Sequence, residues 1–561
     1  MTLHRRRLLQ LAAGVTAGLA GGAEVSGCAS RLSAVQAAAG LPGPSAALAR
    51  AGSAGLEVLR WGLPYGEPDT VDPPNTAAFS SALIAANLCD PLLRLNPDYS
   101  VSPNLADYRQ SDAQTIVFTL RSGVRFWNGD ALTMQDVVWS LKHGFSPETV
   151  VGSAFSMVQS VKQTGPMEVT VSLQYPDSMF VQGMANLPGM IQQASYATKA
   201  GDALGSAQAG IMATGPFKLE RWTPGGGIEL AANPYYWNEA ARPHAKTVQL
   251  LFTTDSGSLA QALVSGQIDG AYEVPAAVIP KLEGSGAGRL AIGEPSQLYL
   301  QLFAVQPDGV YSDPKVRQAL CMTLDRKALA EVVYYGAADP NYTFINTGTW
   351  QTSSTPPAVR ALWQAAYEPF EKVRSTWGST AAIEQAKTLL KQTSYSGEQL
   401  VLGTLAGDAT ISLLAQLVQA QAALAGMNIR IEQLQPIEYE TAQVEASART
   451  GIDMMLSVGY NGTSNPAEPL LYGYLPGSPY NYTGFADKTV IGLIEDGMAE
   501  LDPVAEAKLL IQAQSAIEQR YDSVTLLQIK EICYLRDGLA GAVTSFSYFA
   551  APSLAYIGPS A

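Results

Sequence analysis

The sequence predicts an α/β protein, and two observations point to this class. Segments with the spacing of amphipathic helices alternate with short strand-like segments along most of the chain, a pattern typical of folds in which helices cover sheets. The chain has 561 residues, of which 47% are hydrophobic. This length gives room for about three domains, and the hydrophobic share excludes general disorder.

The first half of the chain contains a predicted hairpin followed by a helix. Residues 115–120 (TIVFTL) alternate as a strand does, and residues 124–127 (VRFW) resume the extended pattern after a turn. Thr133 is a suitable N-cap, and Asp136 stands at the capping-box position. A helix is therefore predicted from Thr133 to about Leu141.

Later segments repeat this alternation of helices and strands. Residues 256–266 have the pattern of a helix that ends at Gly266, and a short strand is predicted at 268–272. Further helices are predicted from Asp313 to Leu320, from Asp325 onward and over residues 411–425, the last followed by a strand at 428–431.

The N-terminal residues 1–27 have the composition of an export signal. Arg5-Arg6-Arg7 precedes an apolar segment, residues 8–20, that is too short and too weakly hydrophobic to span a membrane. The arginines and the residues after them resemble a twin-arginine export motif. We therefore expect an exported protein, located in the periplasm or on the outer face of the cytoplasmic membrane.

Residues 25–28 (VSGC) resemble a lipobox, in which the cysteine is lipidated after cleavage. Cys28 is therefore a candidate lipidation site, and the alternative is a plain signal peptide with an unmodified cysteine. Residues 28–56 are rich in Ala, Gly, Ser and Pro and contain no aromatic residue, which predicts a flexible tether.

The charge balance and the absent motifs limit the function. The chain has 35 Lys+Arg against 49 Asp+Glu, and no run of three basic residues apart from residues 5–7, so a nucleic-acid partner is not expected. There is no G-x-S-x-G, Walker A, H-E-x-x-H or Rossmann glycine motif. Of the three histidines, His143 is expected at the surface and His244 in a turn. We predict no enzyme, no metal site and no cofactor.

Beyond Cys28, the cysteines are Cys89, Cys321 and Cys533, and no CxxC occurs. An exported protein can hold a disulfide, whereas an odd count leaves at least one thiol free. A bridge between Cys321 and Cys533 and a set of buried free thiols both stay open.

Several of these segments, in this order, resemble the extracellular solute-binding proteins of family 5, the peptide-, nickel- and opine-binding class that serves ATP-driven importers. The matching segments are residues 120–141, 214–219, 233–237, 263–269, 316–320 and 325–326, with weaker matches at 67–73 and 426–429. The likeness extends from about residue 56 to residue 558.

The resemblance implies a two-lobed, periplasmic-binding-protein-like α/β fold whose lobes hinge shut on a ligand. It implies three chain-discontinuous domains. Domain I would comprise residues 57–89, 206–292 and 532–561, domain II residues 90–205, and domain III residues 293–531.

The resemblance also locates the ligand contacts on loops and strand ends, where aromatic, amide and carboxylate side chains give area and orientation. For Phe79 and Tyr299 core packing is the alternative, and for Glu273 a solvated surface. The expected ligand-binding residues are Phe79, Phe155, Tyr272, Glu273, Gln297, Tyr299, Gly459, Tyr460, Asn461, Tyr480 and Asn481.

One position departs from the family. Oligopeptide binders of this family place an aspartate late in the third domain, where it pairs with the free amine of the peptide, whereas Gly462 stands there in this chain. Asn461 and Thr463 are uncharged too. A neutral or cationic small solute, or an oligosaccharide held by aromatic residues, is therefore an alternative to a short peptide.

The resemblance predicts a monomer that captures a small solute and delivers it to the permease subunits of an ABC importer. Two alternatives stay open. One is a binding protein on the same fold that presents its ligand to a sensor, and the other is an extracellular hydrolase.

Overall fold

The computed structural model describes residues 50–561, which form two compact units. Unit 1 comprises residues 295–497 and 502–530, and unit 2 comprises the described residues up to 294 together with 498–501 and 531–561. The chain passes between the units within β12 (Gly288–Ala304) and β17 (Ser523–Arg536). The export signal, Cys28 and the tether up to residue 49 lie outside the described residues. The three-domain division stays a prediction.

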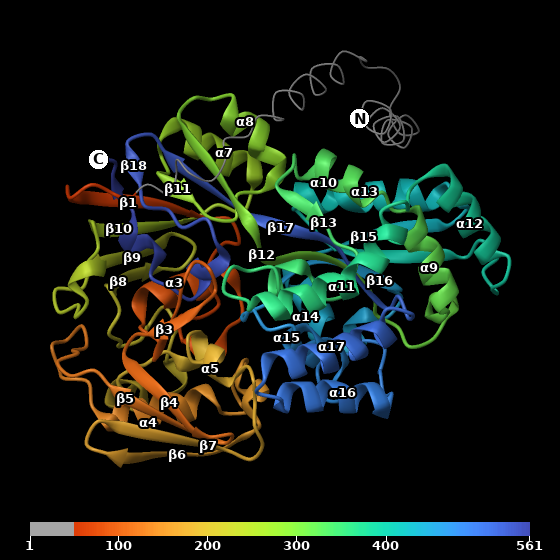
Figure 1. The fold of residues 1–561 in the computed structure, drawn as a ribbon. Coiled ribbons are helices and arrows are strands. Elements are labelled where there is room, and N and C mark those ends of the chain that lie inside the picture. The colour runs from red at the N-terminus through yellow and green to blue at the C-terminus, as the bar shows by residue number, and fades with distance from the viewer. Residues whose placement is uncertain (1–49) are drawn as a thin grey trace. The chain divides into compact units, whose positions relative to one another are not determined.

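The main sheet of unit 2 has the strand order β17-β11-β1-β10-β9-β8 (Figure 1). Its other strands are β1 (Leu56–Leu63), β8 (Phe217–Thr223), β9 (Gly227–Ala232), β10 (Ala245–Phe252) and β11 (Gly270–Ala271). β1 runs parallel to both β10 and β11, with Trp61 opposite Leu250 and Gly270. A Cβ at Gly270 would lie 2.3 Å from the Trp61 ring, so only glycine lets β11 pair here. Of the strand predicted at 268–272, only Gly270–Ala271 forms.

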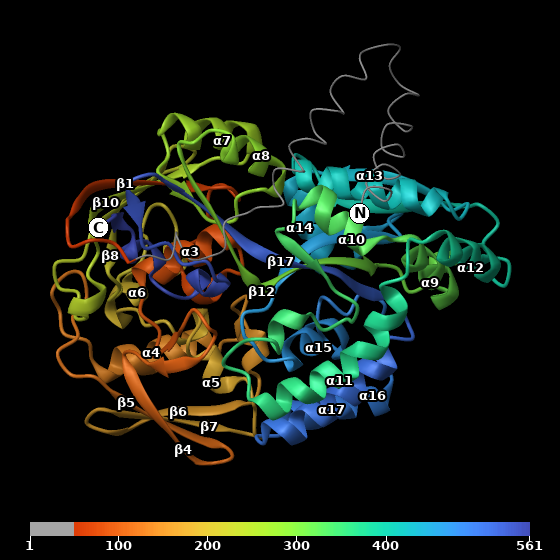
Figure 2. The ribbon, with the colours of Figure 1, turned by 45° about the horizontal axis from the view of Figure 1, so that its top comes forward.

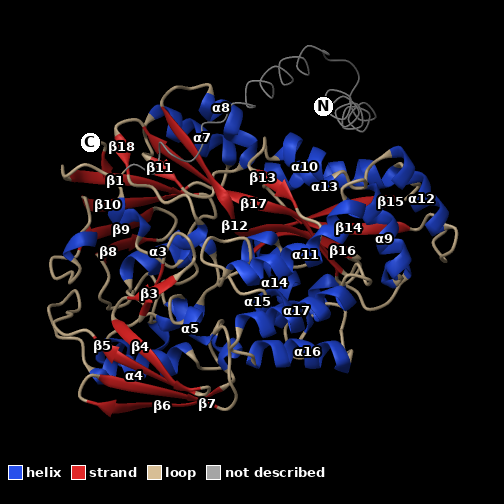
Figure 3. Cartoon of the chain, in the orientation of Figure 1, coloured by secondary structure: helices blue, strands red, loops and turns tan. Residues whose placement is uncertain are grey.

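A second, antiparallel sheet in unit 2 has the order β4-β5-β7-β6 and packs against α4 (Figure 3). Its elements are β4 (Ala106–Asp112), β5 (Thr115–Leu120), β6 (Val158–Gly165), β7 (Glu168–Leu173) and α4 (Met134–Gly144). The capping box of Thr133 and Asp136 is formed as predicted. The predicted strand at 124–127 was wrong, because only an isolated bridge between Arg125 and Ala131 forms there.

The remaining elements of unit 2 are short. The helices are α3 (Phe79–Leu88), α5 (Phe180–Gly183), α6 (Ala194–Ala200), α7 (Ser256–Ser265) and α8 (Ile279–Glu283), and the strand pairs are β2 (Leu93–Leu95) with β3 (Val101–Pro103) and β18 (Leu539–Ala540) with β19 (Gly558–Pro559). The predicted helix α7 is confirmed. Asp255 caps its start by accepting from the Ser258 amide, and Gly266 ends it with φ +74°.

Unit 1 is built on strands in the order β15-β14-β16-β12-β17, with β13 paired to β17. These strands are β13 (Ala338–Pro340), β14 (Gln399–Leu405), β15 (Asn428–Leu434) and β16 (Met454–Tyr460). β14 is parallel to β15 and β16, whereas β16 is antiparallel to β12. Buried Leu300, Leu402 and Leu456 lie in the core at these strands.

Helices pack around the strands of unit 1, and Figure 2 shows α11 and α17 side by side. The helices are α9 (Pro314–Thr323), α10 (Arg326–Val333), α11 (Pro357–Arg374), α12 (Thr380–Leu390), α13 (Ala409–Ala423), α14 (Pro436–Val444), α15 (Ala467–Tyr474), α16 (Lys488–Ala499) and α17 (Pro503–Ile517). The predicted starts at Asp313 and Asp325 are confirmed, because both side chains accept N-cap hydrogen bonds. α13 starts two residues earlier than predicted, because Asp408 is its N-cap.

The three cysteines in the described part of the chain, Cys89, Cys321 and Cys533, are buried free thiols. Within residues 50–561 no helix is long and apolar enough to cross a membrane. The same residues contain no cluster of three or more His, Cys, Asp or Glu side chains placed to hold a metal ion.

Candidate ligand-binding site

A pocket in unit 2 brings together three of the predicted ligand-binding residues, Phe79, Tyr272 and Glu273. The end of β1, the first turns of α3 and the segment after β11 contribute its walls. Because β1 and β11 are parallel, their carboxyl ends lie at the same edge of the sheet, where ligands bind in open α/β sheets. The pocket is lined by Gly62, Leu63, Pro64, Tyr65, Phe79, Ser80, Leu83, Tyr272 and Glu273.

One wall of the pocket is aromatic. Phe79, the first residue of α3, stacks on Tyr65 with ring centroids 4.4 Å apart and an interplanar angle of 14°. Phe546 and Phe549 meet Phe79 edge-on. Tyr65 is 44% exposed, so this wall offers a ring to a ligand. Sequence reasoning missed Tyr65, although its place directly after an apolar strand was an available signal.

Tyr272 borders the pocket from the core of unit 2. Its side chain is 2% exposed and stacks on Tyr548 at 4.4 Å with an interplanar angle of 3°. Its hydroxyl oxygen accepts a hydrogen bond from the Val543 amide at 3.1 Å. Burial raises the pKa of this phenol well above its usual value. Tyr272 therefore holds the pocket in place as part of an aromatic stack.

Glu273 is half-buried at the pocket and has an unusual backbone. Its φ is +55°, a left-handed conformation that costs a residue with a Cβ roughly 1–2 kcal/mol. Its amide donates a hydrogen bond of 2.8 Å to Oε1 of Glu531. This contact turns the chain after β11 so that Glu273 lines the pocket.

Glu531 is the buried carboxyl group that accepts this hydrogen bond. It is 0% exposed, and its Oε2 has no hydrogen-bond partner. Burial raises the pKa of Glu531 to about 8, and burial together with the charge of Glu531 raises the pKa of Glu273 well above its usual value. The sequence reasoning missed Glu531. The available signal was a charged residue inside the apolar strand β17.

Two other residues of unit 2 are positioned outside the lining of this pocket. Phe155 stacks on Phe145 at 5.0 Å and meets Phe180 edge-on, so it belongs to a separate aromatic cluster. His143, which was expected at the surface, is half-buried. Its Nε2 lies 2.8 Å from Asp72 Oδ2, and its ring stacks on Trp139.

Five of the predicted residues of unit 1 lie where β12 pairs with β16: Gln297, Tyr299, Gly459, Tyr460 and Asn461. Tyr299 is opposite Gly459, and the Asn461 amide donates to the Gln297 carbonyl at 3.1 Å. A Cβ at Gly459 would lie 2.8 Å from the Tyr299 ring. Glycine at 459 is therefore what lets the Tyr299 ring lie flat against β16.

Five half-buried tyrosines of unit 1 form what we call the tyrosine cluster: Tyr299, Tyr460, Tyr472, Tyr480 and Tyr482. The Tyr480 ring meets the Tyr472 ring at 6.0 Å and the Tyr482 ring at 6.1 Å, both edge-on. Burial, and next the charge of Glu468, raise the pKa of Tyr299. Besides burial, the charge of Glu468 also raises the pKa values of Tyr460 and Tyr472, so this carboxylate lies near the tyrosine cluster.

Glu468 is buried on α15, and its carboxylate lies against the loop at residues 462–463. It accepts hydrogen bonds of 2.7 Å from the amides of Gly462 and Thr463. A carboxylate is therefore present beside Gly462, although position 462 itself carries no side chain. Burial raises the pKa of Glu468. No local signal in the sequence joined this glutamate to the loop.

Two further predicted residues of unit 1 use their amide groups to brace the chain. Gln297 is buried, and its Nε2 donates to the Gly348 carbonyl at 2.8 Å. Asn481 accepts from the Phe485 amide at 2.7 Å and donates to the Phe485 carbonyl at 3.0 Å. Both amides thus have partners within unit 1.

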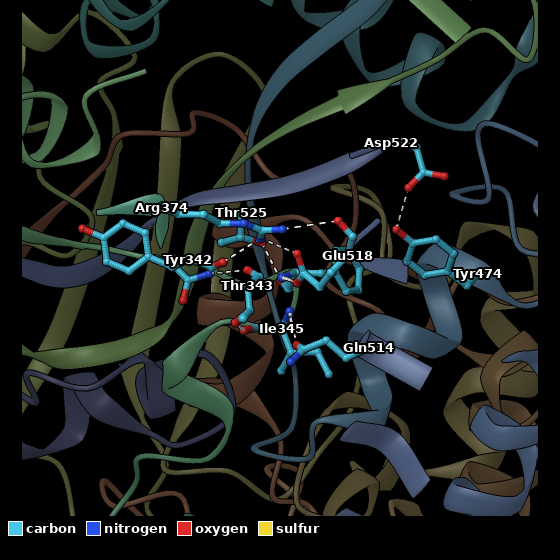
Figure 4. Close-up of polar contacts among 11 residues, drawn as sticks. Tyr342, Thr343, Ile345, Arg374, Tyr474, Gln514, Glu518, Asp522 and Thr525 are labelled. Carbon is cyan, nitrogen blue, oxygen red and sulfur yellow. Dashed lines mark hydrogen bonds and ion pairs between the residues drawn. The ribbon is translucent and has the colours of Figure 1, made fainter. Parts of the chain in front are cut away.

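A buried ion pair, drawn in Figure 4, supports residues 342–348. The Gly348 carbonyl at the end of this segment accepts the hydrogen bond from Gln297. Arg374 pairs with Glu518, and both side chains are 5% exposed. Arg374 Nη1 also donates to the Tyr342 carbonyl at 2.7 Å, and Glu518 accepts from the Phe344 amide. Burial lowers the pKa of Arg374, but the charges of Glu518 and Tyr521 and the hydrogen bonds to them together outweigh burial, so the pKa is raised. This pair fixes the segment that leads to Gly348.

The chain is similar to curated and solved binding proteins along most of its length. It is 24% identical over 490 residues to the glutathione-binding protein GsiB of Salmonella typhi, covering 84% of this chain and 89% of the relative. It superimposes with a TM-score of 0.76 and 17% identity on the murein tripeptide binding protein MppA of Escherichia coli, covering 90% of this chain and 98% of that one. For the oligopeptide-binding protein AppA of Bacillus subtilis, in complex with a nonapeptide, the TM-score is 0.73 at 20% identity, with 91% and 100% covered.

These structural similarities confirm the predicted α/β fold of the periplasmic binding proteins. The model of the bacterial extracellular solute-binding proteins, family 5 Middle, matches residues 100–482, which is more than half of the chain. The chain therefore belongs to the bacterial extracellular solute-binding proteins of family 5.

Proposed function

We propose that this protein captures a small polar solute, such as a short peptide, by holding one of its groups at the pocket of unit 2, and delivers the solute to the permease subunits of an ABC importer. The observation that carries this proposal is the pocket itself, where an aromatic wall and a carboxylate meet at the carboxyl ends of parallel strands. Binding proteins of small ligands use aromatic rings for contact area and a few polar groups for orientation.

The tyrosine cluster supports the same function in unit 1. Aromatic side chains with hydroxyl groups contribute contact area at low entropic cost and can also hydrogen-bond. The relatives' names refer to glutathione, a murein tripeptide and oligopeptides, which favours a peptide-like solute. None of the nine residues that line the pocket is a cysteine or a histidine, so the pocket offers no Cys–His or Ser–His pair of a hydrolase.

The proposed route to the site of action begins with export directed by residues 1–27. Attachment to the outer face of the membrane through a lipid on Cys28, or free diffusion in the periplasm, would both place the protein next to an importer. Mass spectrometry of the protein isolated from cells distinguishes them, because a lipidated Cys28 adds the mass of its acyl chains to the mature N-terminus.

A thermal-shift screen tests solute capture. The panel contains di- to hexapeptides, glutathione, polyamines, opines, oligosaccharides and metal chelates. A solute at 100 times its dissociation constant should stabilise the folded protein by about 2.7 kcal/mol. The variant Phe79→Ala should lose most of this shift, whereas Phe155→Ala, outside the pocket, should keep it. A purified, ligand-free protein that responds to no solute class would contradict the proposal.

A further inference from the structure

Arg326, the first residue of α10, is a buried cation without a counter-ion among the described residues. It is 2% exposed, and none of the three nitrogens of its guanidinium group has a hydrogen-bond partner. Burial lowers the pKa of Arg326, but a guanidinium group keeps its charge at neutral pH. A buried charge is costly unless it is paired and hydrogen-bonded. The start of α10 adds to this cost, because the helix macrodipole places positive charge there.

Aromatic rings flank the Arg326 guanidinium group. Its Cζ lies 5.3 Å from the centroid of the Trp377 ring and 5.8 Å from that of the Tyr342 ring. The quadrupole of each ring attracts a cation, so these contacts offset part of the cost of burial. They do not supply the acceptors that the N–H groups of a buried guanidinium require.

A second arginine contacts the same tryptophan. Cζ of Arg374 lies 5.4 Å from the centroid of the Trp377 ring. Arg374 pairs with Glu518, and both oxygens of this carboxylate are occupied, one by Arg374 and the other by the Phe344 amide. Two buried guanidinium groups therefore share one ring and have one paired carboxylate between them, which leaves one positive charge in excess.

The other groups that face Arg326 carry no negative charge at neutral pH. They are the thiol of Cys321 on α9 and the phenols of Tyr342 and Tyr367. Burial raises the pKa of each of them above its usual value. The neighbouring carboxylate, that of Asp325, caps α10 by accepting a hydrogen bond of 3.0 Å from the Ala328 amide. An anion that satisfies Arg326 must therefore come from the solvent.

We propose that unit 1 binds a chloride ion at Arg326. The single negative charge of chloride balances the excess positive charge, and one halide ion can accept several N–H donors at once. A monoatomic anion suits a group that is 2% exposed better than sulfate or phosphate, whose oxygens would each need a donor of their own. Arg326, Arg374 and Trp377 all belong to unit 1 and do not line the pocket of unit 2, so the inference is independent of solute capture.

Urea unfolding at constant ionic strength tests the proposal. Sodium gluconate is replaced stepwise by sodium chloride at pH 7, which keeps general screening unchanged. Above the dissociation constant of the site, each tenfold rise in chloride should lower the unfolding equilibrium constant of the wild type about tenfold, because the ion binds only the folded chain. Sodium bromide should have the same effect, since bromide is a halide of similar size.

Two variants separate the site from general electrostatics. Arg326→Met removes the charge, keeps an unbranched side chain and should abolish the dependence of stability on chloride. Arg360→Gln removes a positive charge from the half-buried Arg360 of α11 in the same unit and should keep the dependence. A purely structural role of Arg326 would instead shift the stability of Arg326→Met equally in gluconate and in chloride.

A measurement on the wild type keeps the proposal testable if Arg326→Met fails to fold. Crystals grown in sodium bromide should show an anomalous scattering peak within hydrogen-bonding distance of an Arg326 nitrogen. Absence of this peak, or an equal chloride dependence in the wild type and Arg326→Met, would overturn the inference. A peak in a protein whose stability does not respond to chloride would mean binding at crystal concentration only and would overturn it as well. None of these results bears on solute capture.

Discussion

The Glu273 amide donates a hydrogen bond of 2.8 Å to the Glu531 carboxylate, which lies 258 residues later in the chain. This contact combines a left-handed backbone, a fully buried carboxyl group and the edge of a pocket at one place. Because burial raises the pKa of Glu531, this contact makes the stability of unit 2 depend on pH.

Glu531 should make the protein less stable as pH rises. Its pKa is raised from 4.5 to about 8 in the folded protein, so between these values the folded state holds a proton that the unfolded chain has released. Stability then falls with increasing pH across this window. We expect Glu531→Gln to raise the melting temperature more at pH 8.5 than at pH 5. Parallel pH curves for the two proteins would exclude this linkage.

The backbone at Glu273 predicts a difference between two variants that remove the same charge. Glu273→Gly relieves the cost of φ +55°, whereas Glu273→Gln keeps it. Glycine should therefore be more stable than glutamine at this position by about 1 kcal/mol. Urea unfolding of both variants at one pH checks this, and a glutamine variant equal to or more stable than the glycine one would contradict the strain.

Gly459 should not accept a side chain. A Cβ there would approach the Tyr299 ring to 2.8 Å, so Gly459→Ala should cost about 1–3 kcal/mol through overpacking and displace a ring of the tyrosine cluster. A Cβ at Gly492 in α16 would meet no atom of another segment within 4 Å. Gly492→Ala is the control and should stabilise the protein by up to about 1 kcal/mol. Denaturant unfolding measures both effects. Changes of the same sign in the free energy of unfolding of the two variants would contradict this prediction.

Breaking the ion pair of Arg374 and Glu518 should destabilise the protein more than replacing both of its side chains together. Either Arg374→Met or Glu518→Gln alone leaves a buried group without its partner, so each should destabilise by about 3–5 kcal/mol. The double variant should recover part of this loss. In each single variant, hydrogen exchange should show faster opening of residues 342–348, because Arg374 and Glu518 bond to the backbone of this segment. Additive losses in the double variant would mean that the two side chains act independently.

Local signals predicted much of the fold. The capping box at Thr133 and Asp136 and the glycine end of α7 depend on residues within one or two turns, and both formed as expected. The strand at 124–127 failed because a strand needs a partner, and only Arg125 finds one, in an isolated bridge to Ala131.

The candidate site was less predictable, because its decisive contacts are distant in sequence. Phe79, Tyr272 and Glu273 could be named from the resemblance, and they line one pocket. Glu531 could not, since it acts through the Glu273 amide 258 residues earlier in the chain. Glu468 could not either, although the amides of Gly462 and Thr463 are only six and five residues earlier, because such a side-chain contact leaves no pattern in the sequence. Nothing in the spacing of charged residues shows which amide a buried carboxylate will reach.

The order of the chain has a consequence for how the pocket is assembled during synthesis. Unit 2 takes up residues 531–561 only after the whole of unit 1 has been translated. Until β17 emerges from the ribosome, β11 lacks its antiparallel neighbour and the Glu273 amide lacks its acceptor. The nascent protein can thus complete unit 1 while the pocket of unit 2 is still unfinished, and its ability to bind a solute would arise among the last steps of folding.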